Sequence, residues 1–114
     1  MNLNWNQIVS ENDIEKIKED SKEKKVLIFK HSTRCGVSSR ILSRLEQEWQ
    51  PEMSDKIVPY FLNLVAYRNL SNRIAQDFGV RHESPQALVI SDGACIYNDS
   101  HFGIQLEDIA KLLP

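Results

Sequence analysis

The distribution of apolar residues along the chain predicts an alternation of strands and helices. Short apolar runs rich in β-branched and aromatic residues predict buried strands over residues 25–31, 57–65 and 86–91. Apolar residues spaced three and four apart predict helices over residues 10–22, 37–49, 70–78 and 105–113.

Cap and breaker residues set the boundaries of the helices. Ser10 is a favourable N-cap residue, and acidic residues occupy the turn that follows it. Pro51 is expected to close the second helix and Gly79 the third. Before the first helix, the apolar residues among 3–8 predict a short edge strand.

Turn chemistry and one proline define the remaining strands. Asp92-Gly93 is a strong two-residue hairpin signal, so residues 86–91 are expected to pair antiparallel with residues 94–97. Pro59 cannot donate a hydrogen bond to a neighbouring strand. The strand that contains it is therefore expected at a sheet edge, or to begin at about Tyr60.

The order of these elements indicates the fold class. It runs helix, strand, helix, strand, helix, strand, turn, strand, helix, and the first two long strands are expected to be parallel because a helix joins them. This is the order of the thioredoxin-like α/β fold, a mixed four- to five-stranded sheet with helices on both faces. With 114 residues, 41% of them hydrophobic and 26% charged, we expect residues 1–114 to form one soluble domain.

The composition argues against several classes of partner. A net charge of −2 without a long basic run argues against nucleic acid. No stretch approaches the ~20 apolar residues of a membrane span. Residues 1–6 lack the features of a signal peptide, and two cysteines sixty residues apart do not indicate a disulfide framework. We therefore expect a cytoplasmic protein.

Cys35 lies where a predicted strand stops and a predicted helix starts. The first N–H groups of a helix have no partner within it, and this end carries a partial positive charge. Both features favour an anion, so a thiol at this position ionises more readily than one in water. Between Lys30 and Arg44 the chain holds four basic residues and no acid, with Arg34 directly before Cys35. This segment is the candidate reactive site.

Only one of the two cysteines is expected to react. Ser38 stands where dithiol enzymes of this fold carry a second cysteine, and a hydroxyl can donate to a thiolate but cannot resolve a mixed disulfide. In the hairpin, Cys95 lies opposite Ile90, which is about 16 Å from Pro85 at ~3.3 Å per residue. A disulfide requires Cα atoms within about 7 Å. The pattern predicts monothiol chemistry at Cys35, with Cys95 inert.

Further residues are expected near Cys35 by topology. Ser84-Pro85 directly precedes a strand, where thioredoxin-like proteins place a cis-proline that faces the reactive sulfur. His31 ends the first long strand, His82 lies in the loop before Pro85, and His101 follows the returning strand of the hairpin. All three histidines therefore lie near Cys35, although polar loops also carry histidines that have no function.

Three segments together resemble the YtxJ-type monothiol bacilliredoxins. They are Phe29-Lys30-His31-Ser32-Thr33-Arg34-Cys35, residues 67–75 and residues 78–86, and Ser100-His101 fits the same pattern. The resemblance implies a thioredoxin-like fold and removal of bacillithiol from S-bacillithiolated client proteins. It also implies that Cys35 is the reactive cysteine and Pro85 the cis-proline.

The resemblance and the pattern together give a set of expected roles. Bacillithiol is the expected co-substrate, with no bound cofactor or metal, and a second thiol or a disulfide reductase is the expected electron donor. We expect Arg34 and Ser38 to stabilise the Cys35 thiolate, and the basic segment to suit the anionic malate of bacillithiol. The residues expected to bind substrate are His31, Thr33, Gly36, His82, Ser84, Pro85 and His101.

Gly36 leaves other interpretations open. Many bacilliredoxins are expected to carry proline at this position, and Cys35-Gly36-Val37-Ser38 also looks like the Cys-Gly-Phe-Ser signature of monothiol glutaredoxins. Those proteins bind glutathione and can hold iron–sulfur clusters, but this chain lacks their glutathione motif after the hairpin. The remaining alternatives are a metal-binding module that uses Cys35, alone or with a histidine, and a redox-inactive interaction domain.

Overall fold

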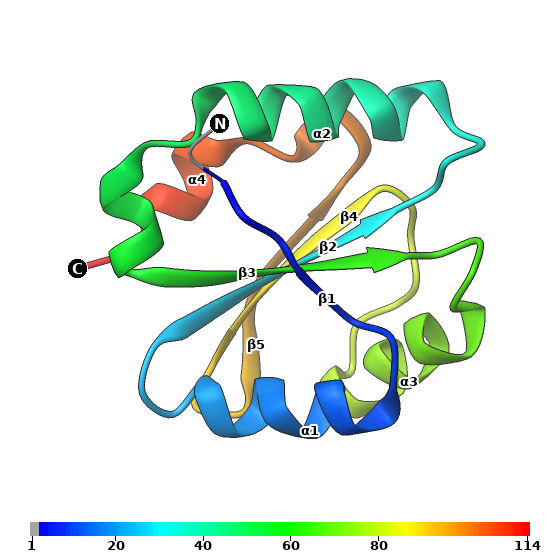
Figure 1. The fold of residues 1–114 in the computed structure, drawn as a ribbon, viewed down its shortest axis with the longest axis horizontal. Helices are drawn as coiled ribbons and strands as arrows, with labels where there is room; N and C mark the ends of the chain where they lie inside the picture. Colours follow the sequence, from blue (N-terminus) through cyan, green and yellow to red (C-terminus); the bar gives the residue numbers. More distant parts are fainter. Residues whose placement is uncertain (1–2) are drawn as a thin grey trace.

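A mixed five-stranded sheet in the order β1-β3-β2-β4-β5 forms the centre of the protein in a computed structural model that describes residues 3–114 (Figure 1). The strands are β1 (Asn6–Gln7), β2 (Lys25–His31), β3 (Ile57–Asn63), β4 (Gln86–Ser91) and β5 (Ala94–Ser100). The helices are α1 (Glu11–Asp20), α2 (Gly36–Glu48), α3 (Arg68–Phe78) and α4 (Leu106–Ala110), with the 3-10 turns η1 (Pro51–Asp55) and η2 (His101–Gly103).

The strand directions follow from the connections between the strands. β2 and β3 are parallel, as predicted for strands joined through a helix, and β1 is also parallel to β3. β4 is antiparallel to both β2 and β5. Asp92 and Gly93 form the predicted two-residue hairpin turn, with φ angles of 52° and 78°. The predicted mixed sheet is confirmed.

The alternation of side chains along β2 builds two apolar layers. Leu27 and Phe29 pack with α2 and α4 on one face, and Val26 and Ile28 pack with α1 and α3 on the other. Figure 1 shows the two pairs of helices on opposite faces of the sheet. All four side chains are fully buried, so the central strand fixes the position of whatever follows its last residue.

Three predicted boundaries require correction. β3 contains Pro59 and does not begin at Tyr60, and it lies between β1 and β2 rather than at the sheet edge. The missing N–H of Pro59 is tolerated because β1 pairs with the two residues after it, Tyr60 and Phe61. β3 also stops at Asn63 rather than residue 65, because the Asn63 side-chain oxygen accepts the N–H groups of the next turn. The last helix covers Leu106–Ala110 instead of residues 105–113.

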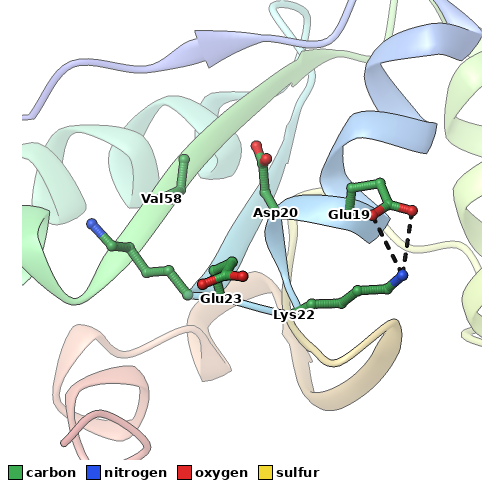
Figure 2. A pocket seen from close by; sticks show the side chains of 6 residues that line it. Glu19, Asp20, Lys22, Glu23 and Val58 are labelled. Atoms are coloured by element: carbon green, nitrogen blue, oxygen red, sulfur yellow. Dashed lines mark hydrogen bonds and ion pairs between the residues drawn. The ribbon is translucent and has the colours of Figure 1, made fainter.

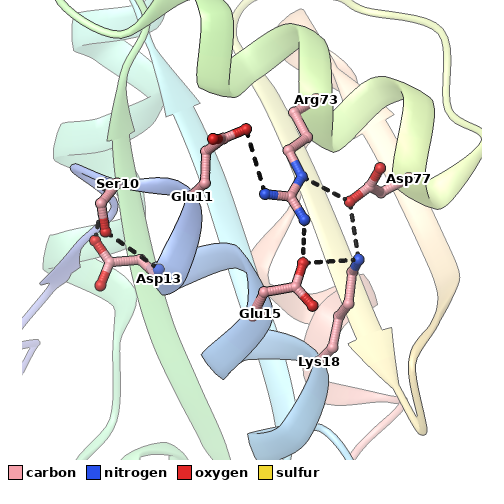
Figure 3. A network of polar contacts seen from close by, with 7 residues as sticks. All are labelled: Ser10, Glu11, Asp13, Glu15, Lys18, Arg73 and Asp77. Carbon is pink, nitrogen blue, oxygen red and sulfur yellow. Dashed lines mark hydrogen bonds and ion pairs between the residues drawn. The ribbon is translucent and has the colours of Figure 1, made fainter.

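An ion-pair network joins α1 to α3 on the outer side of their layer (Figure 3). The Arg73 guanidinium pairs with Glu11, Glu15 and Asp77, and Lys18 pairs with Glu15 and Asp77. At the start of α1, Ser10 and Asp13 form a capping box, which confirms the predicted N-cap. The network therefore holds the first and third helices against each other at one face of the sheet.

Replacing Gly79 by Ala is expected to lower the free energy of unfolding by about 1 kcal/mol, because a side chain destabilises the left-handed conformation. Gly79 ends α3 with a φ of 65° and donates its N–H to the Ala75 carbonyl. Gly36→Ala is the matched control, since Gly36 has no positive φ and an added Cβ would meet nothing within 4 Å. Urea unfolding of both variants tests this, and equal losses would contradict it.

Candidate functional site

Cys35 is the N-cap residue of α2, in the turn that connects β2 to this helix. Its carbonyl accepts the N–H of Ser39 at 3.2 Å, while its side chain makes no cap hydrogen bond. The thiol is partly exposed, and the first turn of α2 carries no acidic residue. The sulfur therefore lies at a helix N-terminus whose N–H groups remain available to an anion.

Ser38 is fully buried beneath the turn that carries Cys35. Its hydroxyl oxygen accepts the Ser32 N–H at 3.1 Å and lies 2.7 Å from Nδ1 of His31. The hydroxyl therefore connects the end of β2 to the first turn of α2. Its role as a donor to the Cys35 thiolate stays a prediction.

The peptide bond between Ser84 and Pro85 is cis, at the position that the sequence indicated. Because Lys30 pairs with Gln86, the end of β2 lies beside the start of β4. The Pro85 carbonyl accepts the His101 N–H at 3.0 Å, and η2 contacts α2. The cis-proline, the end of β5 and the start of α2 therefore lie at one end of the sheet.

The three histidines lie at this end but have different surroundings. His31 is buried against Phe29 and Phe61, and burial lowers its pKa. The His82 ring lies 3.1 Å from the Ser71 hydroxyl; burial, followed by repulsion from Lys30, lowers its pKa. His101 is exposed, with a φ of 53°. Their expected contacts with substrate stay predictions.

Lys30 does not belong to an exposed basic surface, which corrects the sequence interpretation. Its side chain is completely buried, and Nζ donates to the Ser71 carbonyl at 3.2 Å and lies 3.5 Å from Nδ1 of His82. Burial lowers the pKa of Lys30 to about 8. The exposed cations of this segment are Arg34 and Arg40, while Arg44 donates to the Gln105 side chain.

The other predicted binding residues surround Cys35 and Pro85. Thr33 and Arg34 are exposed in the turn before α2, and Gly36 is exposed as the first residue of that helix. Ser84 lies beside Pro85, and its buried hydroxyl has no hydrogen-bond partner among residues 3–114. The turn therefore presents accessible groups around the thiol, and the substrate-binding roles of these residues stay predictions.

Cys95 lies away from this end of the sheet. In the hairpin it pairs with Ile90, as the turn predicts, one pair from the end of the ladder at Ser91 and Ala94. Its thiol donates to the Tyr97 carbonyl at 3.2 Å, and burial raises the pKa of the thiol. Both cysteines are free, so the structure agrees with the predicted lack of a disulfide between them.

Two features are absent from residues 3–114. No cluster of three or more His, Cys, Asp or Glu side chains with the spacing of a metal site occurs there. Within the same residues, no helix has the length and apolar character needed to cross a membrane.

A pocket lies at the opposite end of β2 from Cys35, where α1 leads into the strand (Figure 2). Its walls are mostly charged and include the ion pair between Glu19 and Lys22 at 3.3 Å. The lining residues are Glu19, Asp20, Lys22, Glu23, Lys24 and Val58. This pocket therefore takes no part in the thiol site.

Two features of the site were missed by sequence reasoning. A lysine next to histidine suggests a polar strand end, yet Lys30 and His31 continue the buried alternation of β2. That alternation was the available signal, because Lys30 extends the face of Val26 and Ile28 and His31 extends the face of Leu27 and Phe29. The hydrogen bond between the His31 and Ser38 side chains had no signal in the sequence, because residues seven apart in different elements share no local pattern.

Comparison with known proteins agrees with this geometry. A sequence model of the monothiol bacilliredoxin BrxC family matches residues 6–109. A solved structure described as an oxidoreductase with a thioredoxin fold is 28% identical, with a TM-score of 0.79, and the match covers 92% of this chain and 89% of the other.

Two thioredoxins show the fold at lower identity. The protein from Malassezia sympodialis is 19% identical with a TM-score of 0.73, covering 96% of this chain and 87% of its own. The protein from Fasciola hepatica is 14% identical with a TM-score of 0.66, covering 93% of each chain. The predicted thioredoxin-like fold is confirmed.

Proposed function

The chain belongs to the monothiol bacilliredoxin BrxC family, and from that premise we propose that it removes bacillithiol from S-bacillithiolated proteins. The family and the related oxidoreductase structure identify the chain as a thiol–disulfide oxidoreductase. The proposal adds the substrate to this activity. It also places the reaction in the cytoplasm, with bacillithiolated proteins as partners.

One observation carries the proposal: the partly exposed Cys35 is the N-cap residue of α2, with a serine in place of a second cysteine three residues later. The N–H groups of α2 favour the thiolate, which is the nucleophile in disulfide exchange. Ser38 cannot form a disulfide, and Cys95 is held in the hairpin opposite Ile90. A mixed disulfide on Cys35 therefore persists until an external thiol removes it.

The proposed reaction consists of two exchanges. The Cys35 thiolate attacks the bacillithiol sulfur of the mixed disulfide, a new S–S bond forms, and the client leaves as a thiolate that takes a proton from water. The thiolate of a second bacillithiol then attacks the bacillithiol sulfur held on Cys35. This releases the Cys35 thiolate and bacillithiol disulfide, so each cycle reduces one client mixed disulfide and consumes one free bacillithiol, whose sulfur joins the bacillithiol taken from the client.

The surroundings of Cys35 suit an anionic leaving group and an anionic co-substrate. Arg34 is exposed beside the thiol, and Arg40 is exposed one helical turn into α2. The malate carboxylates of bacillithiol are attracted to these cations.

Intact mass spectrometry with two small disulfides tests this proposal. The Cys95→Ser protein is incubated with bacillithiol disulfide or glutathione disulfide, and the adduct is located by peptide mapping. We expect bacillithiol on Cys35, formed faster than the glutathione adduct and removed by free bacillithiol. Faster transfer from glutathione would favour the glutaredoxin alternative, and no adduct from either would overturn thiol exchange at this site.

A further inference from the structure

The ring of His31 is held in one place by packing. It is the last residue of β2, only 6% exposed, with its ring centroid 6.2 Å from that of Phe29 and 5.4 Å from that of Phe61. Nδ1 lies 2.7 Å from the Ser38 hydroxyl oxygen. Such packing makes His31 a fixed partner for Ser38 rather than a mobile surface group.

The hydrogen-bond capacity of Ser38 limits what this pair can do. A hydroxyl has one hydrogen and accepts at two positions, and one of these is filled by the Ser32 N–H. If His31 carries its hydrogen on Nδ1, the Ser38 oxygen accepts twice and its own hydrogen stays available. If the hydrogen is on Nε2, Ser38 must donate its hydrogen to His31.

Helix geometry places Ser38 on the same side of the first turn of α2 as Cys35. Cys35 and Ser38 are the N-cap and N3 residues of α2, and residues three apart lie on the same side of a helix. Within residues 3–114 the sulfur forms no cap hydrogen bond. A thiolate at Cys35 is the acceptor next to Ser38 that would satisfy the hydrogen of the Ser38 hydroxyl.

We infer that His31 is a positioning residue for the thiol reaction: its Nδ1–H tautomer fills the second acceptor position of Ser38 and directs the Ser38 hydrogen to the Cys35 thiolate. This inference rests on the proposed role of Cys35 as the thiolate nucleophile. It adds a donor chain from Nδ1 through the hydroxyl to the sulfur, in which each hydrogen bond strengthens the next.

A neutral His31 ring carries one hydrogen on its nitrogens, so the tautomer determines whether Ser38 is free to donate to the sulfur. Burial lowers the pKa of His31, although the Glu46 carboxylate on α2 opposes this, so the ring is neutral at pH 7. Glu46 itself accepts the Trp5 indole N–H at 3.0 Å. Formation or loss of the thiolate can therefore be read as a change in which ring nitrogen of His31 carries the hydrogen.

Nitrogen NMR of the histidine rings is the direct test. In reduced protein at a pH where Cys35 is a thiolate, we expect the His31 signals of the Nδ1–H tautomer. Alkylation of Cys35 removes the acceptor, and a shift toward the Nε2–H tautomer is expected. An Nε2–H tautomer in the thiolate form would overturn the inference, because the Ser38 hydrogen would then be bound to His31.

Four proteins in a Cys95→Ser background provide the second test. The pH midpoint of Cys35 alkylation is measured in four proteins: the background itself, His31→Phe, Ser38→Ala, and the double variant that carries both. Loss of a hydrogen bond to a charged group predicts a rise of about one pH unit for Ser38→Ala, and about half of that for His31→Phe. The double variant is expected to match Ser38→Ala, since His31 acts through Ser38.

His31→Asn, whose amide can donate where Nδ1 does, is the conservative variant and is expected to restore the midpoint. If His31→Phe shifts the midpoint by the same amount in the Ser38→Ala protein as in the protein that keeps Ser38, His31 acts independently of Ser38 and the inference fails. If the unsubstituted protein accepts bacillithiol on Cys35 but His31→Phe leaves the alkylation midpoint unchanged, this inference fails and the proposed function stands. No bacillithiol adduct on the unsubstituted protein would overturn the proposed function as well.

Discussion

Cys35→Ser is expected to lose all measurable removal of bacillithiol from a model client protein, a fall of at least ~1000-fold. A serine hydroxyl is not ionised near neutral pH and cannot form a mixed disulfide, so both exchanges stop at once. The N-cap position tolerates serine well, so the fold is expected to persist. Release of bacillithiol from the client, followed by mass spectrometry, measures the loss.

Cys95→Ser is the matched control for this prediction. It exchanges sulfur for oxygen, as Cys35→Ser does, but at the far end of the sheet, where the Cys95 side chain contacts the Tyr97 carbonyl. We expect activity within twofold of the unsubstituted protein. Retained activity in Cys35→Ser, or its loss in Cys95→Ser, would show that the reactive thiol had been assigned to the wrong residue.

Lys30→Met is expected to stabilise the protein by about 2–3 kcal/mol at pH 7. The pKa of Lys30 is lowered from 10.5 to about 8 by burial, which corresponds to an unfavourable contribution of about 3 kcal/mol while the amine is charged. Methionine has a similar shape and carries no charge. Urea unfolding at several pH values measures the difference.

The sign of the pH dependence follows from proton binding. Between about pH 8 and 10.5 the unfolded chain holds the Lys30 proton more tightly than the folded chain, so stability rises with pH in this window. The unfavourable contribution is fully present below about pH 8 and absent above 10.5. The advantage of Lys30→Met should therefore disappear across the same interval.

Lys22→Met is the matched control, because the Lys22 side chain is 57% exposed and pairs with Glu19 at the surface. It is expected to change stability by no more than about 0.5 kcal/mol at any pH. If Lys30→Met instead destabilises the protein at pH 7, then the bonds of Nζ to Ser71 and toward His82 outweigh its desolvation.

Much of the fold was predictable because its signals are local. The strand at residues 25–31, the turn at Asp92-Gly93 and the helix stop at Gly79 each follow from neighbouring residues. The register that places Cys95 opposite Ile90 follows directly from the two-residue turn. The short α4 and the 3-10 turn η1 had weaker patterns, since tertiary packing decides elements of five residues.

The site was predictable in its positions but not in its contacts. Cys35 and Pro85 were located from the order of strand, turn and helix, and His101 from the return of the hairpin. The burial of Lys30 was missed, because a lysine in a sequence indicates surface unless its strand neighbours are considered. The pairing of His31 with Ser38 depends on how α2 meets β2, which no single segment encodes.

The hairpin register has a consequence for how the protein is regenerated. A thiol tethered near Cys35 would act at a fixed effective concentration, whatever the surrounding solution contained. Here the hairpin holds Cys95 opposite Ile90, so reduction of a mixed disulfide on Cys35 requires an encounter with a separate molecule. In the proposed reaction, turnover therefore depends on the supply of an external thiol or disulfide reductase and slows as that supply is consumed.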